Sequence, residues 1–323
     1  MGQVLTVTGL RKRFKGIAAV NDLTLRVPAN CVYGLIGPNG AGKTTLFSLI
    51  GGFLRPDAGV IRLGERDLLQ DGLPLGRIGI LPQDALFQRN VPILDQLSFF
   101  LRLGGAAPAA ARAEVMATLE TVGLQDLSRR SVATFSHGMI KRLALAQAFL
   151  GHPELILLDE PTSGLDPEQT AVVCRLITAL KSTATVLVSS HNLDQLQTIC
   201  DEVAVLNRGR VVAAGPVADF LGAGRRLRLT LNRAVPEELL TALRALPDML
   251  AVTVPSAAGL TLTMSPSAEA DRTLGLCLQA LLGQGLVPRA IEPAQSLESE
   301  VLTLLRQGPG PLPGPGPGAP TAP

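Results

Sequence analysis

The segment from Gly37 to Thr44 constrains the fold of this chain most, because it fits the phosphate-binding pattern G-x-x-x-x-G-K-[ST]. Glycines in such a loop allow backbone angles that point successive N–H groups at phosphate oxygens, close to a helix start. An apolar run at 31–36 precedes the loop as a buried strand does, and residues 45–50 follow it with helical apolar spacing. This context favours a nucleotide-binding loop over an ordinary strand-to-helix turn. The predicted nucleotide contacts here are Gly37, Pro38, Asn39, Gly40, Ala41, Gly42, Lys43, Thr44 and Thr45.

A second apolar run, at 155–158, ends in the acidic pair Asp159 and Glu160. Lys43 would meet the outer phosphates as a point charge. The hydroxyl of Thr44 and the carboxylate of Asp159 would contact a magnesium ion that bridges those phosphates. The two motifs together predict a nucleotide hydrolase that uses Mg²⁺.

The stretch between these motifs predicts a capped, amphipathic helix. Ser136 lies where an N-cap would be, and Met139, Leu143, Ala146 and Leu150 fall on one helical face. With its basic residues, this stretch resembles the L-S-G-G-Q signature and following helix of the ATP-binding-cassette (ABC) ATPases. The apolar stripe itself is a core face, so only Ser136 and a glycine two residues later carry the functional claim.

The resemblance covers residues 1–222 and implies an α/β fold, a P-loop nucleotide hydrolase core with a helical signature subdomain. In that family the signature of one subunit closes over the ATP held by another, which gives two composite sites in a head-to-tail dimer. It therefore implies that Ser136 and Gly138 bind ATP and that Ser136 lies at a dimer interface. The sequence departs from the family pattern at Phe135, His137 and Met139.

Further residues match the family's landmarks in order and spacing. Gln83 resembles the glutamine that contacts the metal and senses the membrane partner. Glu160 follows Asp159 as the family's general base does, and a plain loop carboxylate is the alternative. Asp166 resembles a residue of the loop that crosses the dimer interface, although Asp166 and Pro167 also read as the N-cap and first turn of a helix.

His191 and Phe14 complete the predicted site. His191 follows an apolar strand at 185–190, at a strand exit where parallel sheets place their ligands, and it matches the family's switch histidine. The resemblance implies that it contacts the γ-phosphate. Phe14 resembles the aromatic residue that stacks on adenine, with simple packing in an N-terminal hairpin as the alternative.

Composition favours a cytosolic chain. The hydrophobic fraction is 46%, yet no uninterrupted apolar stretch reaches the roughly 18 residues of a membrane-spanning helix. No signal peptide is visible, and a net charge of +2 without a basic block argues against a nucleic-acid partner. The scattered cysteines are expected to be reduced core residues: Cys31, Cys174, Cys200 and Cys277.

A second domain is predicted at 225–306. Its apolar pattern gives the order β-α-β-β-α-β, a small ferredoxin-like arrangement, with a covering helix at about 296–305. It resembles the C-terminal extension of drug-exporter-type ABC ATPases, and we interpret it as a dimerisation or stabilising module. Residues 307–323 are almost wholly Gly and Pro and are expected to be disordered.

The resulting hypothesis is an ATP-hydrolysing subunit that powers transport, with export favoured, through a permease on a separate chain. Its partners would be a second copy of itself or a related ATPase subunit, and that membrane permease. It would be peripheral, at the cytoplasmic face of the plasma membrane. The alternatives are a soluble ABC ATPase that remodels a ribosome or DNA complex, and a regulatory module that closes on ATP without significant hydrolysis.

Overall fold

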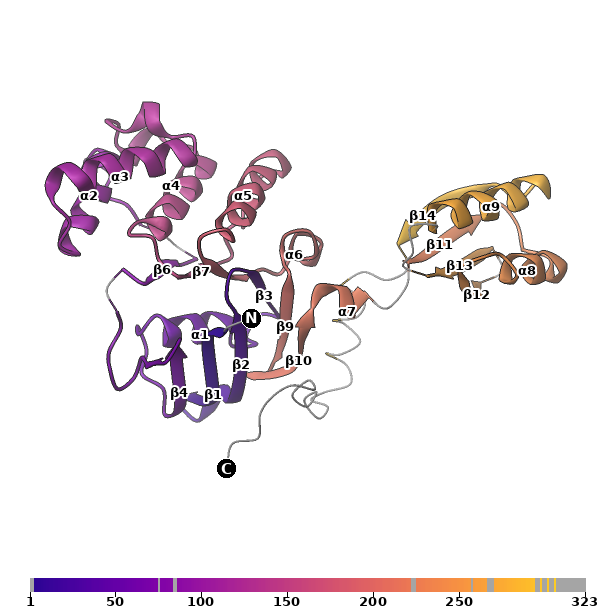
Figure 1. Cartoon of the computed structure of the whole chain (residues 1–323), viewed down its shortest axis with the longest axis horizontal. Helices are drawn as coiled ribbons and strands as arrows, with labels where there is room; N and C mark the ends of the chain where they lie inside the picture. Colours follow the sequence, from indigo (N-terminus) through magenta and orange to yellow (C-terminus); the bar gives the residue numbers. More distant parts are fainter. Residues whose placement is uncertain are drawn as a thin grey trace. The chain divides into compact units, whose positions relative to one another are not determined.

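The computed structural model describes residues 3–74, 76–83, 86–221, 225–256, 258–265 and 270–293, with positions 297, 301 and 305 (Figure 1). The chain divides into two compact units. The first contains residues 1–215 and 304–323, and the second contains residues 216–303. Each unit is described by itself below.

A largely parallel sheet forms the centre of the first unit, in the strand order β10-β9-β3-β8-β7-β6. Every residue of β3, β7 and β8 is buried, as expected for aliphatic strands covered on both faces. Parallel pairing of β3 with β8 and of β8 with β7 brings their carboxyl ends to one edge, where Asp159 pairs with Ser189. The strands are β3 (Val32–Ile36), β6 (Ile78–Leu81), β7 (Leu155–Asp159), β8 (Thr185–Ser189), β9 (Glu202–Asn207) and β10 (Arg210–Pro216).

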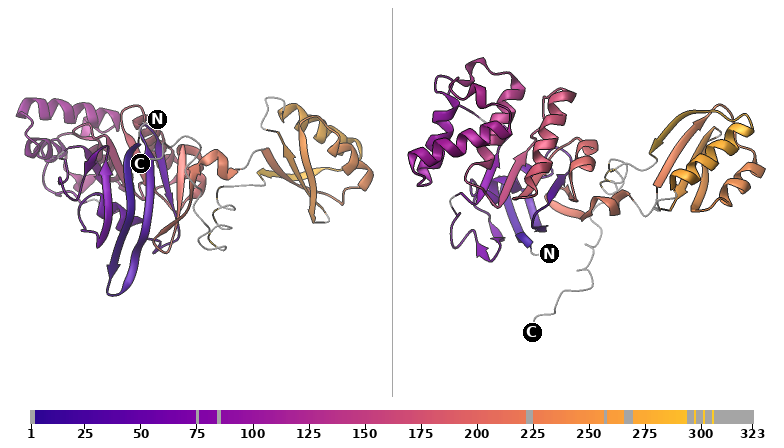
Figure 2. Two further views of the ribbon diagram at one scale, coloured as in Figure 1. Left: turned by 60° about the horizontal axis from the view of Figure 1, so that its bottom comes forward. Right: turned by 45° about the horizontal axis from the view of Figure 1, so that its top comes forward.

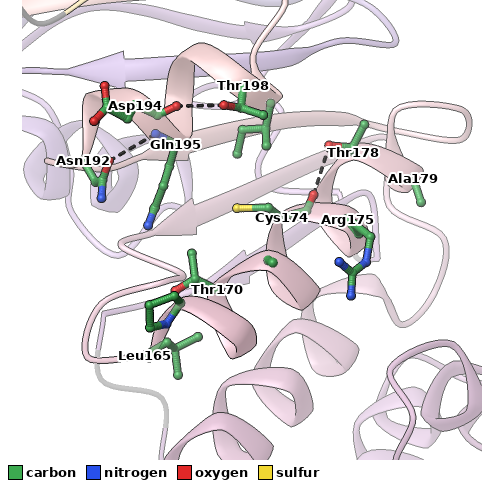
Figure 3. Close-up of a pocket in the computed structure, with 13 residues that line it drawn as sticks. Leu165, Thr170, Cys174, Arg175, Thr178, Ala179, Asn192, Asp194, Gln195 and Thr198 are labelled. Atoms are coloured by element: carbon green, nitrogen blue, oxygen red, sulfur yellow. Dashed lines mark hydrogen bonds between the residues drawn. The ribbon is translucent and has the colours of Figure 1, made fainter. Parts of the chain in front are cut away.

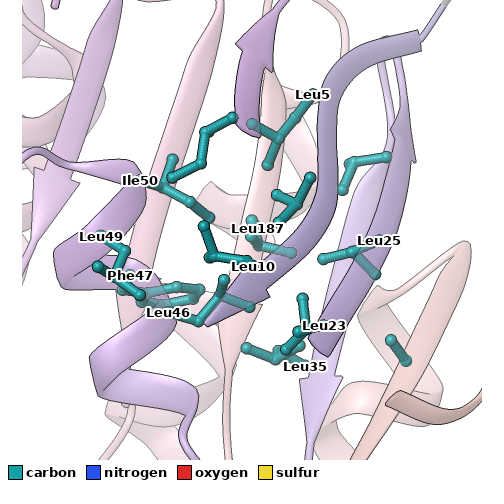
Figure 4. Close-up of a cluster of buried hydrophobic side chains, with 14 of the residues drawn as sticks. Leu5, Leu10, Leu23, Leu25, Leu35, Leu46, Phe47, Leu49, Ile50 and Leu187 are labelled. Atoms are coloured by element: carbon teal, nitrogen blue, oxygen red, sulfur yellow. The ribbon is translucent and has the colours of Figure 1, made fainter. Parts of the chain in front are cut away.

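An antiparallel sheet, in the order β2-β1-β4-β5, faces the parallel sheet across helix α1 (Lys43–Ile50). Figure 4 shows how α1 contributes Leu46, Phe47 and Ile50 to the apolar cluster between them, which also contains Leu10 of β1 and Leu187 of β8. Packing on two sides fixes the start of α1, and therefore the phosphate loop that precedes it. The strands of this sheet are β1 (Gln3–Phe14), β2 (Ile17–Pro28), β4 (Ala58–Leu63) and β5 (Arg66–Asp67).

Helices α2, α3 and α4 are grouped together, apart from β1, β2 and β4 (Figures 1 and 2). The predicted stripe of α4 is confirmed, because Leu143 and Ala146 are fully buried in their shared cluster and Met139 and Leu150 pack against it. The helix ends at Phe149, so Leu150 is its C-cap. The helices of the first unit beyond α1 are α2 (Ile93–Leu103), α3 (Pro108–Thr121), α4 (His137–Phe149), α5 (Pro167–Leu180) and α6 (Leu193–Ile199), with 3₁₀ turns at Gln125–Leu127 and Val132–Thr134.

The second unit has the predicted element order around a sheet of order β12-β13-β11-β14, in which β11 pairs antiparallel with β13 and β14. Helices α8 and α9 cover one face of that sheet (Figure 2), and leucines of α8 and Cys277 of α9 belong to the apolar core of the unit. Its assignment as ferredoxin-like stays a prediction. The elements are α7 (Val217–Leu221), β11 (Arg225–Leu231), α8 (Glu237–Arg244), β12 (Met249–Ser256), β13 (Gly259–Met264), α9 (Ala270–Gly283) and β14 (Pro288–Pro293).

Two predictions for the C-terminal residues lie largely or wholly outside the described residues. Of the helix expected at 296–305, positions 297, 301 and 305 are described, and all are helical. The tail at 307–323 is outside the described residues. Among the described residues, no helix has the length and apolar character needed to cross a membrane.

The predicted placement of the cysteines is correct for three and wrong for one. Cys31, Cys200 and Cys277 are buried free thiols, and burial raises the pKa of Cys31 to about 12 and that of Cys277 to about 11. Cys174 is only half-buried. Its helix α5 buries Val173 and Ile177 instead, so Cys174 lies beside the buried stripe rather than on it.

Candidate active site

The phosphate loop leaves the end of β3 and enters α1. Gly42 has a φ of 106°, and a Cβ there would collide with the carbonyl oxygen of Ala19, so glycine is required at this position. The next residue, Lys43, is 7% exposed, and its Nζ donates to the carbonyls of Gly37 (2.7 Å) and Pro38 (3.2 Å). Burial lowers the pKa of Lys43, while nearby Glu160 partly opposes that shift.

Asp159 and Glu160 lie where β7 ends. Asp159 is 4% exposed and accepts a hydrogen bond from the Oγ of Ser189. The N–H of Glu160 donates to both the carbonyl and the Oγ of Ser189, each at 3.2 Å. Glu160 has a φ of 51°, a left-handed conformation that is uncommon outside glycine and is found where the surroundings fix a functional side chain.

His191 follows β8 and reaches the same carboxylate. Its Nδ1 lies 2.8 Å from Oε2 of Glu160, and because a carboxylate only accepts, Nδ1–H is the donor. The His191 side chain is 67% exposed and that of Glu160 is 12% exposed. The pair therefore has a fixed carboxylate and a histidine that remains accessible from solvent.

These groups line one cavity of 530 Å³. Most of the predicted site residues border it: Asn39, Gly40, Gly42, Lys43, Thr44, Thr45, Gln83, Asp159, Glu160 and His191. Ala19 and Ser163 line it as well, without having been predicted as site residues. Because the loop, the acidic pair and the histidine come from three different parallel strands, the fold itself assembles them.

The oxygen ligands in this cavity fit a magnesium ion. Within the described part of the chain, no three His, Cys, Asp or Glu side chains come together as a metal cluster. Thr44, Gln83 and Asp159 supply hydroxyl, amide and carboxylate oxygens, and Mg²⁺ prefers a few such protein ligands, substrate phosphates and water to a closed protein cage.

Six of the predicted ATP-binding residues do not line the cavity: Phe14, Gly37, Pro38, Ala41, Ser136 and Gly138. The carbonyls of Gly37 and Pro38 bind Lys43, and Ala41 is buried beneath the loop. Phe14 ends β1, where the residue is 43% exposed and the centroid of its ring lies 5.7 Å from Nζ of Lys12. Both the predicted stacking on adenine and the alternative of simple packing in the hairpin therefore stay predictions for Phe14.

Ser136, Gly138 and Asp166 do not line the phosphate cavity of their own chain. The Ser136 hydroxyl accepts the Met139 N–H at 3.3 Å, which confirms the predicted N-cap of α4. Asp166 caps α5, because its Oδ1 accepts the Gln169 N–H at 2.8 Å. Gly138 is buried, and a Cβ there would lie 2.7 Å from Oε1 of Gln169. The caps explain part of these motifs, and the exposed Ser136 and Asp166 remain available to another chain.

Sequence reasoning missed two residues that the structure places at this site. Ser189 is the last residue of β8 and contacts both Asp159 and Glu160. Lys141 of α4 is 7% exposed and donates to the carbonyl of Gln83 at 3.2 Å. A serine that ends an apolar strand just before His191 was the available signal for Ser189, whereas Lys141 looked like one of the helix's solvated basic residues.

A larger hollow of 980 Å³ lies between α5 and α6 (Figure 3). Cys174 and Thr170 of α5 border it together with Gln195 of α6. No residue that lines it also lines the phosphate cavity. It is therefore separate from the nucleotide chemistry, although Leu165 at its edge belongs to the loop that leads into α5.

Comparison with known proteins decides the family. The model of the ABC transporter family matches residues 20–163. The daunorubicin resistance ATP-binding protein DrrA3 of Streptomyces coeruleorubidus is 38% identical over 235 residues, which are 71% of this chain and 74% of that protein. The chain belongs to the ABC transporter family.

Other members agree. The Nod factor export ATP-binding protein I of Ralstonia nicotianae is 34% identical over 214 residues, 66% of this chain and 67% of its own. The solved structure of cbiO1 from Clostridium perfringens, part of the ABC transporter complex cbiONQ, has a TM-score of 0.61 at 26% identity and covers 68% of this chain and 90% of that one. As an ABC ATPase, the chain hydrolyses ATP to energise transport. The comparisons therefore favour the transport hypothesis over the alternative of a soluble ATPase that remodels a ribosome or DNA complex.

Proposed function

We propose that this ABC ATPase hydrolyses ATP with Mg²⁺ in the cavity around Lys43 and drives export through a permease on a separate chain. The observation that carries the proposal is the joint placement of Lys43, Asp159 and the Glu160–His191 pair in one cavity. A protein that only binds the nucleotide needs Lys43 for the phosphates. It does not need a carboxylate that is fixed in a strained backbone conformation and bonded to a histidine.

Lys43, with the backbone N–H groups of its loop, would bind the outer phosphates. Thr44, Asp159 and Gln83 would hold the magnesium ion, which supplies charge neutralisation at the phosphates when bound. Glu160 would accept a hydrogen bond from the attacking water and take its proton, while His191 holds the Glu160 carboxylate in place through Nδ1–H. In the imidazolium form, in which both ring nitrogens are donors, Nε2–H of His191 would also donate to a phosphate oxygen. Phe14 would stack on the adenine.

A second copy, or a related ATPase subunit, would complete each site. Ser136 is exposed at the N-terminus of α4, where N–H groups favour an anion, and it lies outside its own chain's phosphate cavity. Asp166 is exposed as well. Both placements support a head-to-tail pair in which each copy presents Ser136 and Gly138 to the other's ATP.

The permease would dock on exposed apolar side chains that follow Gln83 in the sequence. Leu86 is 92% exposed, and α2 presents Phe99 (55%), Phe100 (45%) and Leu103 (66%). Exposed aromatic and aliphatic side chains this close in sequence are typical of a protein–protein interface. Gln83 lines the phosphate cavity and precedes Leu86 closely in the sequence, so docking and hydrolysis would be coupled through it.

Export from the cytoplasmic face of the plasma membrane is the direction we favour. Among the relatives, one is named for Nod factor export and another for daunorubicin resistance. The second unit would serve as a dimerisation or stabilising module, because its described residues form a core without adding to the phosphate cavity.

The test is co-purification. Tagged Glu160→Gln protein is isolated from membranes in mild detergent with Mg²⁺ and ATP, and every retained chain is identified by mass spectrometry. We expect one multi-spanning membrane protein in stoichiometric amount, and its loss from the Phe99→Ser/Phe100→Ser double variant, which should still bind ATP. Recovery of ribosomes, or of a soluble complex with no membrane chain, would overturn the proposal.

A further inference from the structure

Helix α4 presents a histidine and a lysine on one face of its first turns. His137 and Lys141 are four residues apart, so their side chains project from neighbouring positions on the helix surface. Lys141 is 7% exposed, which is rare for a lysine unless its ammonium group is hydrogen-bonded. Its Nζ donates to the backbone carbonyl of Gln83 at 3.2 Å, across 58 positions of sequence.

The histidine reaches a different loop. Nε2 of His137 lies 3.4 Å from the backbone carbonyl of Ser163, and since a carbonyl only accepts, Nε2–H is the donor. Ser163 in turn donates its N–H to the carbonyl of Glu160 at 3.2 Å. This contact therefore leads from α4 to the backbone of Glu160.

The two residues whose carbonyls contact α4 line the same cavity. Both Gln83 and Ser163 line the phosphate cavity, as do Asp159 and Glu160. One face of α4 thus bonds two cavity-lining loops from outside, while its own N-terminal residue Ser136 does not line the cavity.

We propose that Lys141 and His137 are positioning residues that connect α4 to the Gln83 loop and to the Ser163 loop. The inference rests on the proposed function, because it concerns the geometry of the same hydrolytic site. Lys141 fixes the backbone from which the Gln83 amide extends into the cavity, and His137 fixes the loop bonded to Glu160. A displacement of α4 therefore moves both loops together.

His137 is specific to this chain's version of the signature. A glycine at position 137 would have no side chain to reach the Ser163 carbonyl. The histidine at position 137, where the family pattern has glycine, therefore adds a hydrogen bond between α4 and the loop beside Glu160. Its effect is more than a loss of the backbone freedom that glycine would give.

The experiment is a double-mutant cycle on Mg²⁺-dependent ATP hydrolysis by the full chain. Its variants are Lys141→Met, Gln83→Ala and the double variant, and each has kcat, the KM for ATP and the Mg²⁺ concentration for half-maximal activity measured. If Lys141 acts through Gln83, Lys141→Met lowers kcat or the apparent Mg²⁺ affinity by about tenfold or more, as loss of a supporting partner of a metal site does. It should leave the KM for ATP within about twofold, because the Lys43 contacts persist. In the Gln83→Ala background the same substitution should have little further effect.

Two variants separate positioning from folding. Lys141→Arg keeps a cationic donor and should restore most of the activity. Arg142→Met is the matched control, because Arg142 is the next residue of α4 and donates to the carbonyl of Val122, away from the cavity, at 3.0 Å. Loss of this hydrogen bond is expected to lower the thermal unfolding temperature but to leave the Mg²⁺ dependence unchanged.

Should Lys141→Met fail to fold, the exposed His137 supplies the second route. His137→Gly should lower kcat several-fold, and His137→Gln, which keeps an N–H donor, should recover it. Equal and additive losses in both Gln83 backgrounds would overturn the inference. So would wild-type kcat and wild-type Mg²⁺ dependence in Lys141→Met together with wild-type kcat in His137→Gly. Absence of Mg²⁺-dependent hydrolysis in the wild-type protein would instead contradict the proposed function.

Discussion

The Nδ1 atom of His191 lies 2.8 Å from Oε2 of Glu160, although 31 residues separate them in sequence. Glu160 directly follows the buried strand β7, and His191 lies two residues beyond the end of the buried strand β8. These two strands are neighbours in the parallel sheet. The pair is therefore a product of strand order. A carboxylate that is 12% exposed and bonded to an accessible imidazole is suited to hold a water against a phosphate.

Replacing His191 with alanine should slow hydrolysis without unfolding the protein. Loss of a positioned hydrogen-bond donor costs about 100-fold or more in kcat. Because the side chain is 67% exposed, we expect the free energy of unfolding to change by less than about 0.5 kcal/mol. Steady-state phosphate release and thermal unfolding measure the two effects. His152→Asn, at a turn histidine with a positive φ that asparagine tolerates, is the control and should keep wild-type activity.

Lys43→Ala should weaken ATP binding. The ammonium group would make charge-assisted bonds to phosphate, and removing them costs about 1.5–3 kcal/mol, or roughly 10- to 150-fold in Kd. Titration with ATP measures the change. Lys181→Ala removes the same charge from an exposed ion pair with Asp201 and should leave Kd unchanged. Equal Kd values for Lys43→Ala and wild type would show that this lysine does not bind the phosphates.

Two glycines of the phosphate loop should differ in their tolerance of alanine. Gly42→Ala places a Cβ against the carbonyl of Ala19 at a φ of 106°, so we expect a displaced loop, lost ATP binding and lower stability. Gly40 also has a positive φ, of 80°, but a Cβ there meets no atom within 4 Å. Gly40→Ala should cost only about 1–2 kcal/mol of backbone strain. Thermal unfolding and ATP titration of both variants check this; equal behaviour would contradict the clash.

The two suggested roles of Asp166, as a helix N-cap and as an interface residue, can be separated by substitution. As the N-cap of α5 it should contribute about 1 kcal/mol, which Asp166→Ala removes and Asp166→Ser largely restores. A role at a subunit interface predicts more than that. If Asp166 also contacts a second subunit, ATP-dependent dimerisation, measured by sedimentation, stays impaired in Asp166→Ser although its thermal stability returns. Recovery of both properties in Asp166→Ser would leave only the structural role.

The sequence was informative where chemistry and periodicity are local. The phosphate loop, the buried strands at 32–36 and 155–159 and the caps by Ser136 and Asp166 could all be predicted, since each depends on neighbouring residues. The contact of Ser189 with Asp159 could not, because it depends on which strands pair and in what register.

Burial of individual helix residues was also beyond a local pattern. Lys141 is buried with its ammonium group donating a hydrogen bond to a carbonyl 58 positions away, and no periodicity indicates that partner. Cys174 is half-exposed because α5 faces a hollow on that side. In each case the deciding neighbour comes from a distant part of the chain.

The most direct test of the account is phosphate release by Glu160→Gln protein, compared with wild type in the same membrane complex at saturating Mg²⁺ and ATP. Glutamine keeps the size of the side chain and one acceptor oxygen for His191, but it cannot take a proton. We expect ATP binding to be unchanged and turnover to fall by about two to four orders of magnitude, the usual contribution of a general base. Hydrolysis by Glu160→Gln at the wild-type rate would contradict the assignment of Glu160 and the mechanism built on it.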